Sequence, residues 1–174
     1  VRLSRKLGYD GFPELKRAVK SHQKLSLQHE YQNISDEDSP FEVIRKVFDF
    51  SIQGLTDSLN MIDHDQHAAA VNAVLSANKI LFCGVGDAAA VAMEAHHRFL
   101  RLGMQSLFSL DSDIQLVLAN QLKEGDLVIA VSHSGRSTNI LDTVKVGSDT
   151  GASTLVITSY PVSPLAKRSD IVLQ

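Results

Sequence analysis

Short runs of apolar residues that alternate with helical segments are the feature that most constrains the fold of this chain. From Lys79 onward the sequence predicts five strands, at 80–83, 106–109, 127–131, 154–158 and 171–173. The strongest of them, LVIAV at 127–131, has no polar residue on either face. Strands that are apolar on both faces are typical of parallel sheets covered by helices on both sides.

Helical segments connect these predicted strands. They lie at 88–102, 113–122 and 137–148, and a short helix is expected after Ser163 and Pro164. Gly103 is a typical stop for the first of them. Parallel strands need such crossover connections. We therefore expect an α/β fold over 39–174, a three-layer α/β/α domain with a five-stranded parallel sheet.

Two further helices are predicted before the first strand. Ser39 and Pro40 are typical of an N-cap and a first helical position. Apolar residues then follow at three- and four-residue spacing: Phe41, Ile44, Val47, Phe48, Ile52, Leu55 and Leu59. This apolar stripe predicts a dimer face or a surface that covers the sheet, and both roles can hold. The second helix starts after Asp63 or Asp65 and runs through Leu75.

The first 24 residues form a basic head on an acidic chain. They carry seven Lys or Arg against two Asp or Glu, whereas the other 150 residues carry ten against 18. A basic head indicates contact with a polyanion, or simply a solvated helix surface. Residues 1–7 resemble the end of a helix stopped by Gly8, so the sequence looks like part of something longer. We expect 1–30 to be the all-α remnant of another domain and the polar stretch 31–38 to be a linker.

Cysteine and membrane signals point to the cytoplasm. The single cysteine, Cys83, lies in an apolar run and cannot support a disulfide framework, which indicates a reducing compartment. No apolar run approaches the roughly 20 residues that a membrane span needs, and nothing resembles a signal peptide. His64 and His67 could share a helix face, but no carboxylate or thiolate set completes a metal site. We expect no metal.

The strongest predicted strand ends in a turn rich in serine, residues 132–138, named the serine loop below. Free N–H groups at a helix start and the helix dipole favour anions, hydroxyls add donors, and a glycine lets the backbone approach a ligand. The pattern predicts a phosphate site without a metal or a Walker lysine. Alternatively, Ser137 is only an N-cap in a polar loop. The candidate ligand-binding residues are Ser132, His133, Ser134, Gly135, Ser137 and Thr138.

A second turn, residues 84–87, follows the first predicted strand and is named the glycine loop below. With Asp111 ending the second strand, it nearly matches the dinucleotide-binding fingerprint. Asp87 would repel a pyrophosphate, and a tight turn that lets an alanine-rich helix pack closely is another explanation. We expect Gly84, Gly86 and Asp87 to face the serine loop and hold the sugar end of a ligand.

No acid/base pair for catalysis stands out. Glu94 with His96 or His97 could serve as a base and its partner, but a helix surface or an interhelical contact is the favoured role. His133 could sense the second ionisation of a bound phosphate, or be an exposed turn residue.

These motifs together resemble the sugar isomerase (SIS) domain family over residues 40–174. The resemblance rests on the glycine loop, the serine loop and the segments 91–94 (VAME) and 98–101 (RFLR). Residues 1–16 (VRLSRKLGYDGFPELK) resemble the end of the recognition helix and the next helix of RpiR-type bacterial transcription regulators. Those regulators join an N-terminal helix-turn-helix domain to a SIS domain.

The resemblance carries expectations for individual residues. It implies phosphate contacts from the serine loop, namely Ser132, Ser134, Ser137 and the backbone of His133 and Gly135. Ala88 stands where the family often has serine, and Asp113 where it often has histidine. It further implies that 1–30 is a truncated helix-turn-helix remnant whose Arg2, Arg5 and Lys6 contact DNA phosphates. The family's final SIS helix is absent from this sequence.

We therefore expect a cytoplasmic transcription regulator, not an enzyme, that binds DNA through its N-terminal domain and a phosphosugar through its SIS domain. It should act as a homodimer or homotetramer without a cofactor. The alternative is a sugar-phosphate isomerase of the SIS fold, which needs a general base beside the sugar. A dinucleotide-binding domain would leave the serine loop unexplained.

Overall fold

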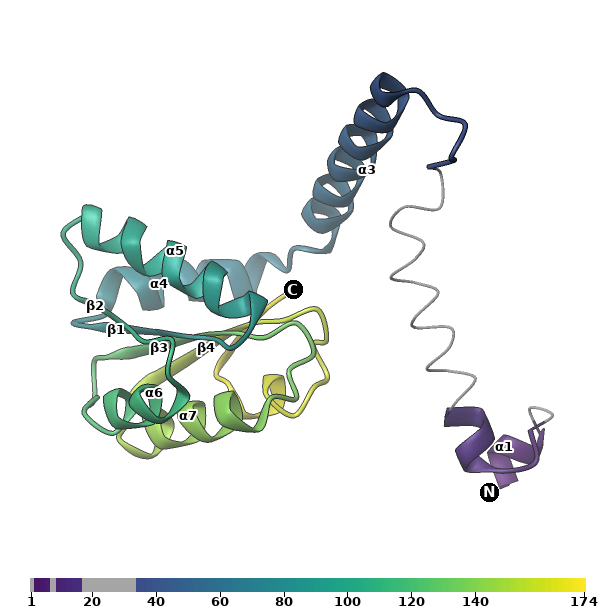
Figure 1. Cartoon of the computed structure of the whole chain (residues 1–174). Coiled ribbons are helices and arrows are strands. Elements are labelled where there is room, and N and C mark those ends of the chain that lie inside the picture. The colour runs from purple at the N-terminus through teal and green to yellow at the C-terminus, as the bar shows by residue number, and fades with distance from the viewer. Residues whose placement is uncertain (1, 7–8, 17–33) are drawn as a thin grey trace. The chain divides into compact units, whose positions relative to one another are not determined.

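The computed structural model describes residues 2–6, 9–16 and 34–174 (Figure 1). The chain divides into two compact units, Val1–Asn60 and Met61–Gln174. The expected domain limits near residue 30 fall on residues 17–33, which lie outside the described residues, so those limits stay predictions.

The first unit contains helix α1 (Arg2–Lys6), a helical stretch at 12–16 and most of the long helix α3 (Pro40–Met61). Ser39 Oγ accepts a hydrogen bond from the N–H of Glu42 at 3.3 Å, and the Glu42 carboxylate accepts one from the N–H of Ser39 at 2.8 Å. This reciprocal pair is a capping box, and it confirms the predicted helix start. No residue of α3 is buried, so the whole apolar stripe is exposed.

The second unit is built on a five-stranded parallel sheet in the order β2-β1-β3-β4-β5. The strands are β1 (Ile80–Cys83), β2 (Ser106–Phe108), β3 (Leu127–Val131), β4 (Ser153–Ile157) and β5 (Ile171–Leu173). The predicted α/β class and the parallel five-stranded sheet are confirmed, and each strand lies within one residue of its predicted limits.

Helices cover both faces of this sheet, because successive strand residues point to opposite sides. The helices are α4 (His64–Ser76), α5 (Asp87–Arg101), α6 (Ser112–Ala119) and α7 (Thr138–Asp149). Leu81 and Val128 belong to a core with α6 and α7, whereas Ile80 and Ile129 belong to a core with α4 and α5. Figure 1 shows α4 and α5 on one side of the sheet and α6 and α7 on the other.

Two helix limits differ from the sequence prediction. Helix α6 ends at Ala119, three residues early, because the N–H groups of Gln121 and Leu122 bond to carbonyls three residues back, at 3.1 and 3.2 Å. The short helix expected after Ser163 is a single 3₁₀ turn, η1 (Ala166–Arg168), whose first N–H donates to Ser163 Oγ at 3.3 Å.

The structure also bears on membrane insertion, metal binding and the reactivity of the cysteine. Among residues 2–6, 9–16 and 34–174, no helix has the length and apolar character to cross a membrane. Those residues also contain no group of three or more His, Cys, Asp or Glu side chains placed to hold a metal ion. Burial raises the pKa of the Cys83 thiol to about 12, so this cysteine stays protonated and unreactive at neutral pH.

Gly147 lies on α7 close against the sheet, and it supplies a test of the packing. A Cβ added there would lie 2.6 Å from Cγ2 of Val128, a fully buried side chain. We expect Gly147→Ala to lower the free energy of unfolding by about 1–3 kcal/mol, as overpacking does, in urea denaturation.

The matched control is Gly54→Ala in α3, where an added Cβ meets nothing within 4 Å. Alanine has the higher helix propensity, so the control should leave stability unchanged or raise it by up to about 1 kcal/mol. If both variants behaved alike, α7 would not lie this close to β3.

Candidate functional site

The glycine loop and the serine loop leave neighbouring strands at the same edge of the sheet. Cys83 of β1 pairs with Ala130 of β3, so both loops begin where these two strands end. The chain runs from β1 to β2 on one side and from β3 to β4 on the other. Such a switch point opens a crevice between helices on opposite faces, and ligands of open parallel α/β sheets bind there.

The serine loop folds back tightly on itself. The N–H of Ser132 donates to the carbonyl of Ile157 at 3.0 Å, and the N–H of Gly135 donates to the carbonyl of Ser132 at 3.2 Å. Gly135 is buried and has a φ of 58°. That left-handed conformation suits glycine, because a Cβ makes it strained. Glycine at this turn therefore has a conformational cause, whereas its predicted role in the approach of a ligand stays a prediction.

The connection between β4 and β5 braces the serine loop from the side. The carbonyl of His133 accepts from Thr158 Oγ1 at 3.1 Å and from the N–H of Ser159 at 3.2 Å. The carbonyl of Gly135 accepts from the N–H of Leu165 at 3.1 Å. A Cβ at Gly135 would collide with Ser163, whose Cβ lies 2.5 Å from that position. These bracing residues were not predicted from the sequence, because nothing local links them to the serine loop.

The start of α7 offers hydrogen-bond donors. Ser137 is the N-cap residue, but its side chain makes no capping hydrogen bond. No described residue accepts a hydrogen bond from the N–H groups of Thr138, Asn139 and Ile140. Helix N-termini with free N–H groups and a positive dipole end bind anions. Ser137 is therefore the N-cap residue of α7 without a side-chain cap, and anion binding at this helix start stays a prediction.

His133 and Ser134 are exposed on the serine loop. His133 Nδ1 lies 2.9 Å from Ser159 Oγ, and its ring meets the Tyr160 ring edge-on with centroids 5.7 Å apart. Ser134 Oγ accepts a hydrogen bond from the N–H of Arg136 at 3.3 Å. These contacts hold His133 in place and leave the Ser134 hydroxyl proton available to a ligand.

The glycine loop is a tight turn into α5. A Cβ at Gly84 would lie 2.7 Å from the Ala88 carbonyl oxygen, so only glycine fits where the helix begins. Gly86 has a φ of 60° as the N-cap residue, and Asp87 is exposed at the first helical position. Asp111 caps α6 by accepting from the N–H groups of residues 113 and 114, at 2.8 and 3.0 Å. Because the Asp111 carboxylate caps this helix, it differs from the acidic residue of a dinucleotide site, which binds the ribose hydroxyls.

Gln115 is a residue of this region that the sequence analysis did not single out. It lies on α6 with an exposed fraction of 0%. Its Nε2 donates to the carbonyl of Gly84 at 2.9 Å and to the carbonyl of Ser109 at 2.8 Å. The residue therefore joins the loop after β1 to the loop after β2.

The candidate acid/base residues on α5 have other partners. The Glu94 carboxylate accepts from Arg98 Nε at 2.7 Å on the exposed face of the helix. His96 Nδ1 lies 2.7 Å from Ser106 Oγ, and burial, followed by the charge of His97, lowers the pKa of His96. These contacts agree with the favoured structural roles.

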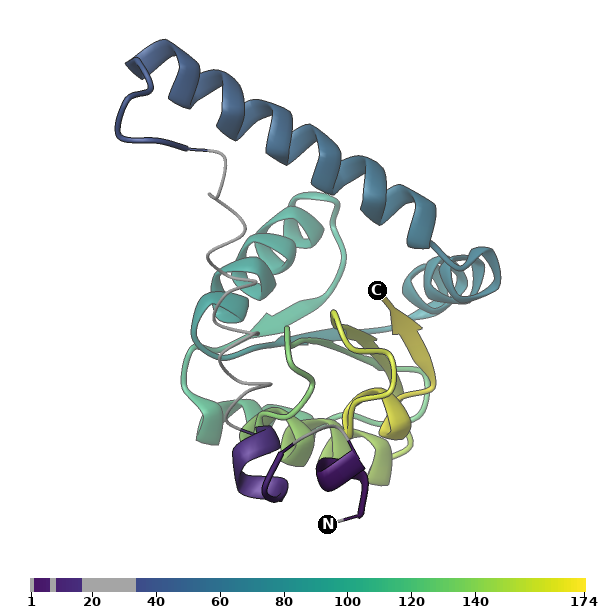
Figure 2. The same cartoon turned by 90° about the vertical axis from the view of Figure 1, so that its right-hand side faces the viewer.

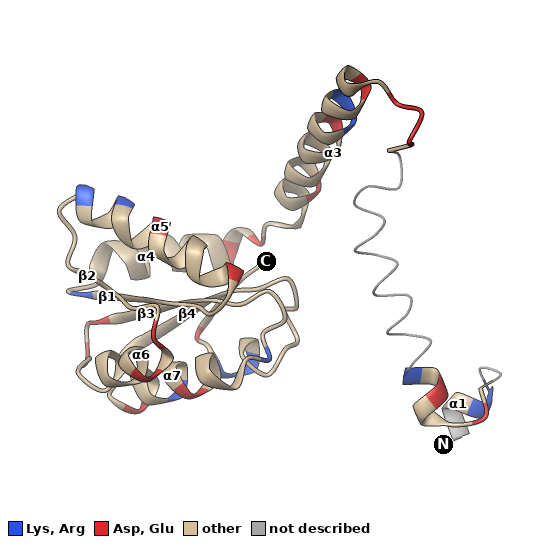
Figure 3. Cartoon of the chain, in the orientation of Figure 1, with Lys and Arg blue, Asp and Glu red and all other residues tan. Residues whose placement is uncertain are grey.

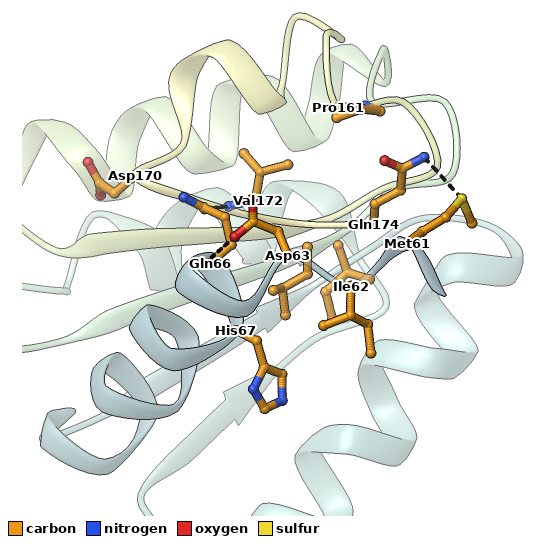
Figure 4. Close-up of a pocket in the computed structure, with 11 residues that line it drawn as sticks. Met61, Ile62, Asp63, Gln66, His67, Pro161, Asp170, Val172 and Gln174 are labelled. Atoms are coloured by element: carbon orange, nitrogen blue, oxygen red, sulfur yellow. Dashed lines mark hydrogen bonds between the residues drawn. The ribbon is translucent and has the colours of Figure 1, made fainter. Parts of the chain in front are cut away.

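A pocket of about 620 Å³ lies between the start of α4 and the strands β4 and β5 (Figure 4). Figure 4 shows Gln66 reaching β5, where its Oε1 accepts from the N–H of Val172 at 2.8 Å. Asp63, not Asp65, caps α4. No residue predicted for ligand binding lines this pocket, so it gives no support to the predicted site.

Two of the three predicted DNA contacts can be placed. Arg5 and Lys6 are exposed at the end of α1, and Figure 3 shows the basic residues of this region in blue. The side chain of Arg2 lies outside the described part of the chain. Contact of these residues with DNA stays a prediction.

The fold and the two loops together define a sugar isomerase domain. A family model for the SIS domain matches residues 74–174, and the chain belongs to that family. Its five-stranded sheet, with a serine-rich loop after the central strand, is the part that the match covers.

Similarity to transcription regulators extends over nearly the whole chain. An uncharacterized HTH-type transcriptional regulator of Thermotoga maritima is 32% identical over 99% of this chain and 62% of the relative. The regulator RpiR of Escherichia coli K12 is 28% identical over 99% and 58%. The predicted resemblance to RpiR-type regulators is thereby confirmed. The chain spans about three fifths of the length of these relatives.

A solved structure is also similar over nearly the whole chain. The Vibrio vulnificus NanR protein complexed with ManNAc-6P superposes with a TM-score of 0.74 and 25% identity, over 99% of this chain and 60% of that one. The similarity supports the fold of the whole domain, and it is a similarity to a protein whose structure contains a phosphosugar.

The close contact at Gly135 can be tested by substitution. Gly135→Ala must strain a left-handed residue and also displace Ser163, so we expect a loss of about 2–4 kcal/mol in the free energy of unfolding. Urea denaturation of the purified variant measures this loss.

Gly103→Ala serves as the control, because Gly103 has a φ of 80° and nothing lies within 4 Å of an added Cβ. Its free energy of unfolding should fall only by the cost of a left-handed backbone at alanine, about 1–2 kcal/mol. Equal losses in the two variants would show that Ser163 does not press on the serine loop.

Proposed function

We propose that this chain is the sensing part of a bacterial transcription regulator, whose SIS domain binds a phosphosugar at the serine loop. The observation that carries the proposal is the start of α7. Three consecutive N–H groups there have no acceptor among the described residues, and the serine loop that leads into the helix carries four hydroxyls. A phosphate needs several donors at once, and this arrangement supplies them.

The proposed phosphate contacts are mainly neutral. The serine loop holds one cationic side chain, the exposed Arg136, and otherwise offers hydroxyls and N–H groups. Each hydrogen bond to a charged group contributes roughly 1.5–3 kcal/mol. A few such bonds can hold a dianion reversibly, which suits a sensor that must release its effector.

The sugar end of the ligand would lie toward the glycine loop. That loop leaves the neighbouring strand at the same edge of the sheet, and it carries the exposed carboxylate of Asp87. Carboxylates accept hydrogen bonds from sugar hydroxyls. The similarity to NanR, whose solved structure is a complex with ManNAc-6P, supports a phosphosugar as the ligand class.

The regulator would bind DNA through its N-terminal helices and work as a homodimer or homotetramer in the cytoplasm. Arg5 and Lys6 support contact with DNA phosphates, since they are exposed on α1. The exposed apolar stripe of α3 supports self-association, because a helix of this length with such a face is stabilised by packing.

The alternative of a sugar-phosphate isomerase has less support. An isomerase needs a general base within hydrogen-bond reach of the substrate. Glu94 is paired with Arg98, and His96 contacts Ser106. The relatives from Thermotoga maritima and Escherichia coli K12, which each match over 99% of the chain, are named as transcription regulators.

Ligand binding can be tested with a thermal-shift screen of ManNAc-6P, glucose 6-phosphate, ribose 5-phosphate and a ketodeoxy-acid phosphate. Ser134→Ala removes one hydroxyl donor to the phosphate. We expect it to weaken binding of the best ligand by roughly 1.5–3 kcal/mol, or about ten- to a hundredfold in Kd.

Ser153→Ala is the matched control, because Ser153 is exposed at the opposite end of the sheet, where β4 begins. The control should bind as tightly as the wild type. Undiminished binding by Ser134→Ala, or no shift with any phosphosugar, would contradict a phosphate site on the serine loop.

The regulatory role predicts a linkage between effector and DNA. In the full-length protein, a saturating phosphosugar should change operator affinity by about 5–150-fold, and operator DNA should change phosphosugar affinity by the same factor. Fluorescence anisotropy with labelled operator measures the first factor, and calorimetry with and without DNA measures the second. If no phosphosugar altered the operator affinity, the proposed regulatory role would be refuted.

A further inference from the structure

We propose that Gln115 is a positioning residue that shapes the sugar-binding half of the site and sets its selectivity for a phosphosugar over bare phosphate. The inference rests on the proposed phosphosugar site. It concerns the end of that site away from the serine loop.

The hydrogen bonds of Gln115 connect two loops that are far apart in the sequence. Its Nε2 donates to the carbonyl of Gly84, the first residue after β1, at 2.9 Å. The same nitrogen donates to the carbonyl of Ser109, the first residue after β2, at 2.8 Å. With both amide protons used, one side chain fixes the positions of both loops relative to α6.

The other end of the same amide has no protein partner. Gln115 Oε1 is buried and accepts no hydrogen bond from the described residues. Exchanging the amide atoms would not help, because the oxygen would then face two carbonyls. A buried acceptor without a donor is rare in folded proteins and needs an explanation. A hydroxyl of the ligand, directly or through a bridging water, supplies the missing donor when these loops adjust around it.

The chemistry of the two halves is complementary to the two ends of a phosphosugar. The serine loop on β3 presents donors, which a phosphate requires. The side of β1 and β2 carries acceptors, namely the exposed Asp87 carboxylate and the buried, unpartnered Gln115 Oε1. Sugar hydroxyls donate hydrogen bonds to such acceptors. A ligand whose phosphate lies on the serine loop therefore meets the Gln115 side with its hydroxyls.

The decisive variant is Gln115→Met, which keeps the length of the side chain but removes both donors and the acceptor. Calorimetry would measure Kd for inorganic phosphate and for the phosphosugar with the largest thermal shift in the panel above. We expect phosphosugar affinity to fall at least about tenfold, the loss of one hydrogen bond to an anchored ligand. Affinity for inorganic phosphate should stay within about twofold.

Gln66→Met is the control, because Gln66 also holds a backbone group, the N–H of Val172, but on β5 away from both loops. It should leave both affinities unchanged. A residue with only a structural role would reduce the affinities for phosphate and phosphosugar alike, or neither, and either result in Gln115→Met would overturn the inference.

Hydrogen exchange on the wild-type protein gives a second test if Gln115→Met does not fold. Inorganic phosphate should protect amides of the serine loop and the start of α7. The phosphosugar should also protect peptides that cover the glycine loop and residues 109–115. Protection confined to the serine loop and α7 would overturn the role of Gln115 and leave the phosphate site standing. Absence of binding by every phosphosugar would instead overturn the proposed function.

Discussion

The in-register parallel pairing of β1 with β3 is the constraint on which the rest of this domain depends. It places Cys83 beside Ala130, so the loops that follow both strands start at one edge of the sheet. Because the two crossovers proceed in opposite directions along the sheet, α5 and α7 belong to different helix layers. Figure 2 shows these layers from the side, on either face of the sheet. The two short loops therefore lie at the edge where open parallel α/β sheets bind their ligands.

The serine loop is held in place by the connection between β4 and β5. Three hydrogen bonds from the β4–β5 connection reach the carbonyls of His133 and Gly135, and Ser163 fills the space beside Gly135 that a side chain would need. Donors held in place before a ligand arrives bind it without a large ordering cost. The parallel order β3-β4-β5 thus does more than complete the sheet, because it positions the start of α7.

The sequence predicted the strands and both loops, because their signals are local: consecutive apolar residues, clustered hydroxyls and glycines at strand ends. It could not predict Gln115. The apolar residues of the short helix α6 do not form one stripe, so periodicity does not say which side faces the core. The outcome reverses the usual expectation, since Ile114 and Val117 are about half exposed (48% and 52%) while Gln115 is fully buried. A buried polar residue of this kind is recognised only by its contacts with distant carbonyls.

In the proposed regulator, the division of the site into two halves determines what the protein can sense. A phosphate on the serine loop contacts the start of one helix, α7, in one layer. A phosphosugar that also reaches the glycine loop contacts the start of α5 in the other layer, and so joins both layers through one ligand. A ligand shifts a conformational equilibrium only by its difference in affinity between two states. The free energy that distinguishes the effector from other phosphorylated metabolites must then arise at the sugar end. Every such metabolite offers the same phosphate group to the serine loop.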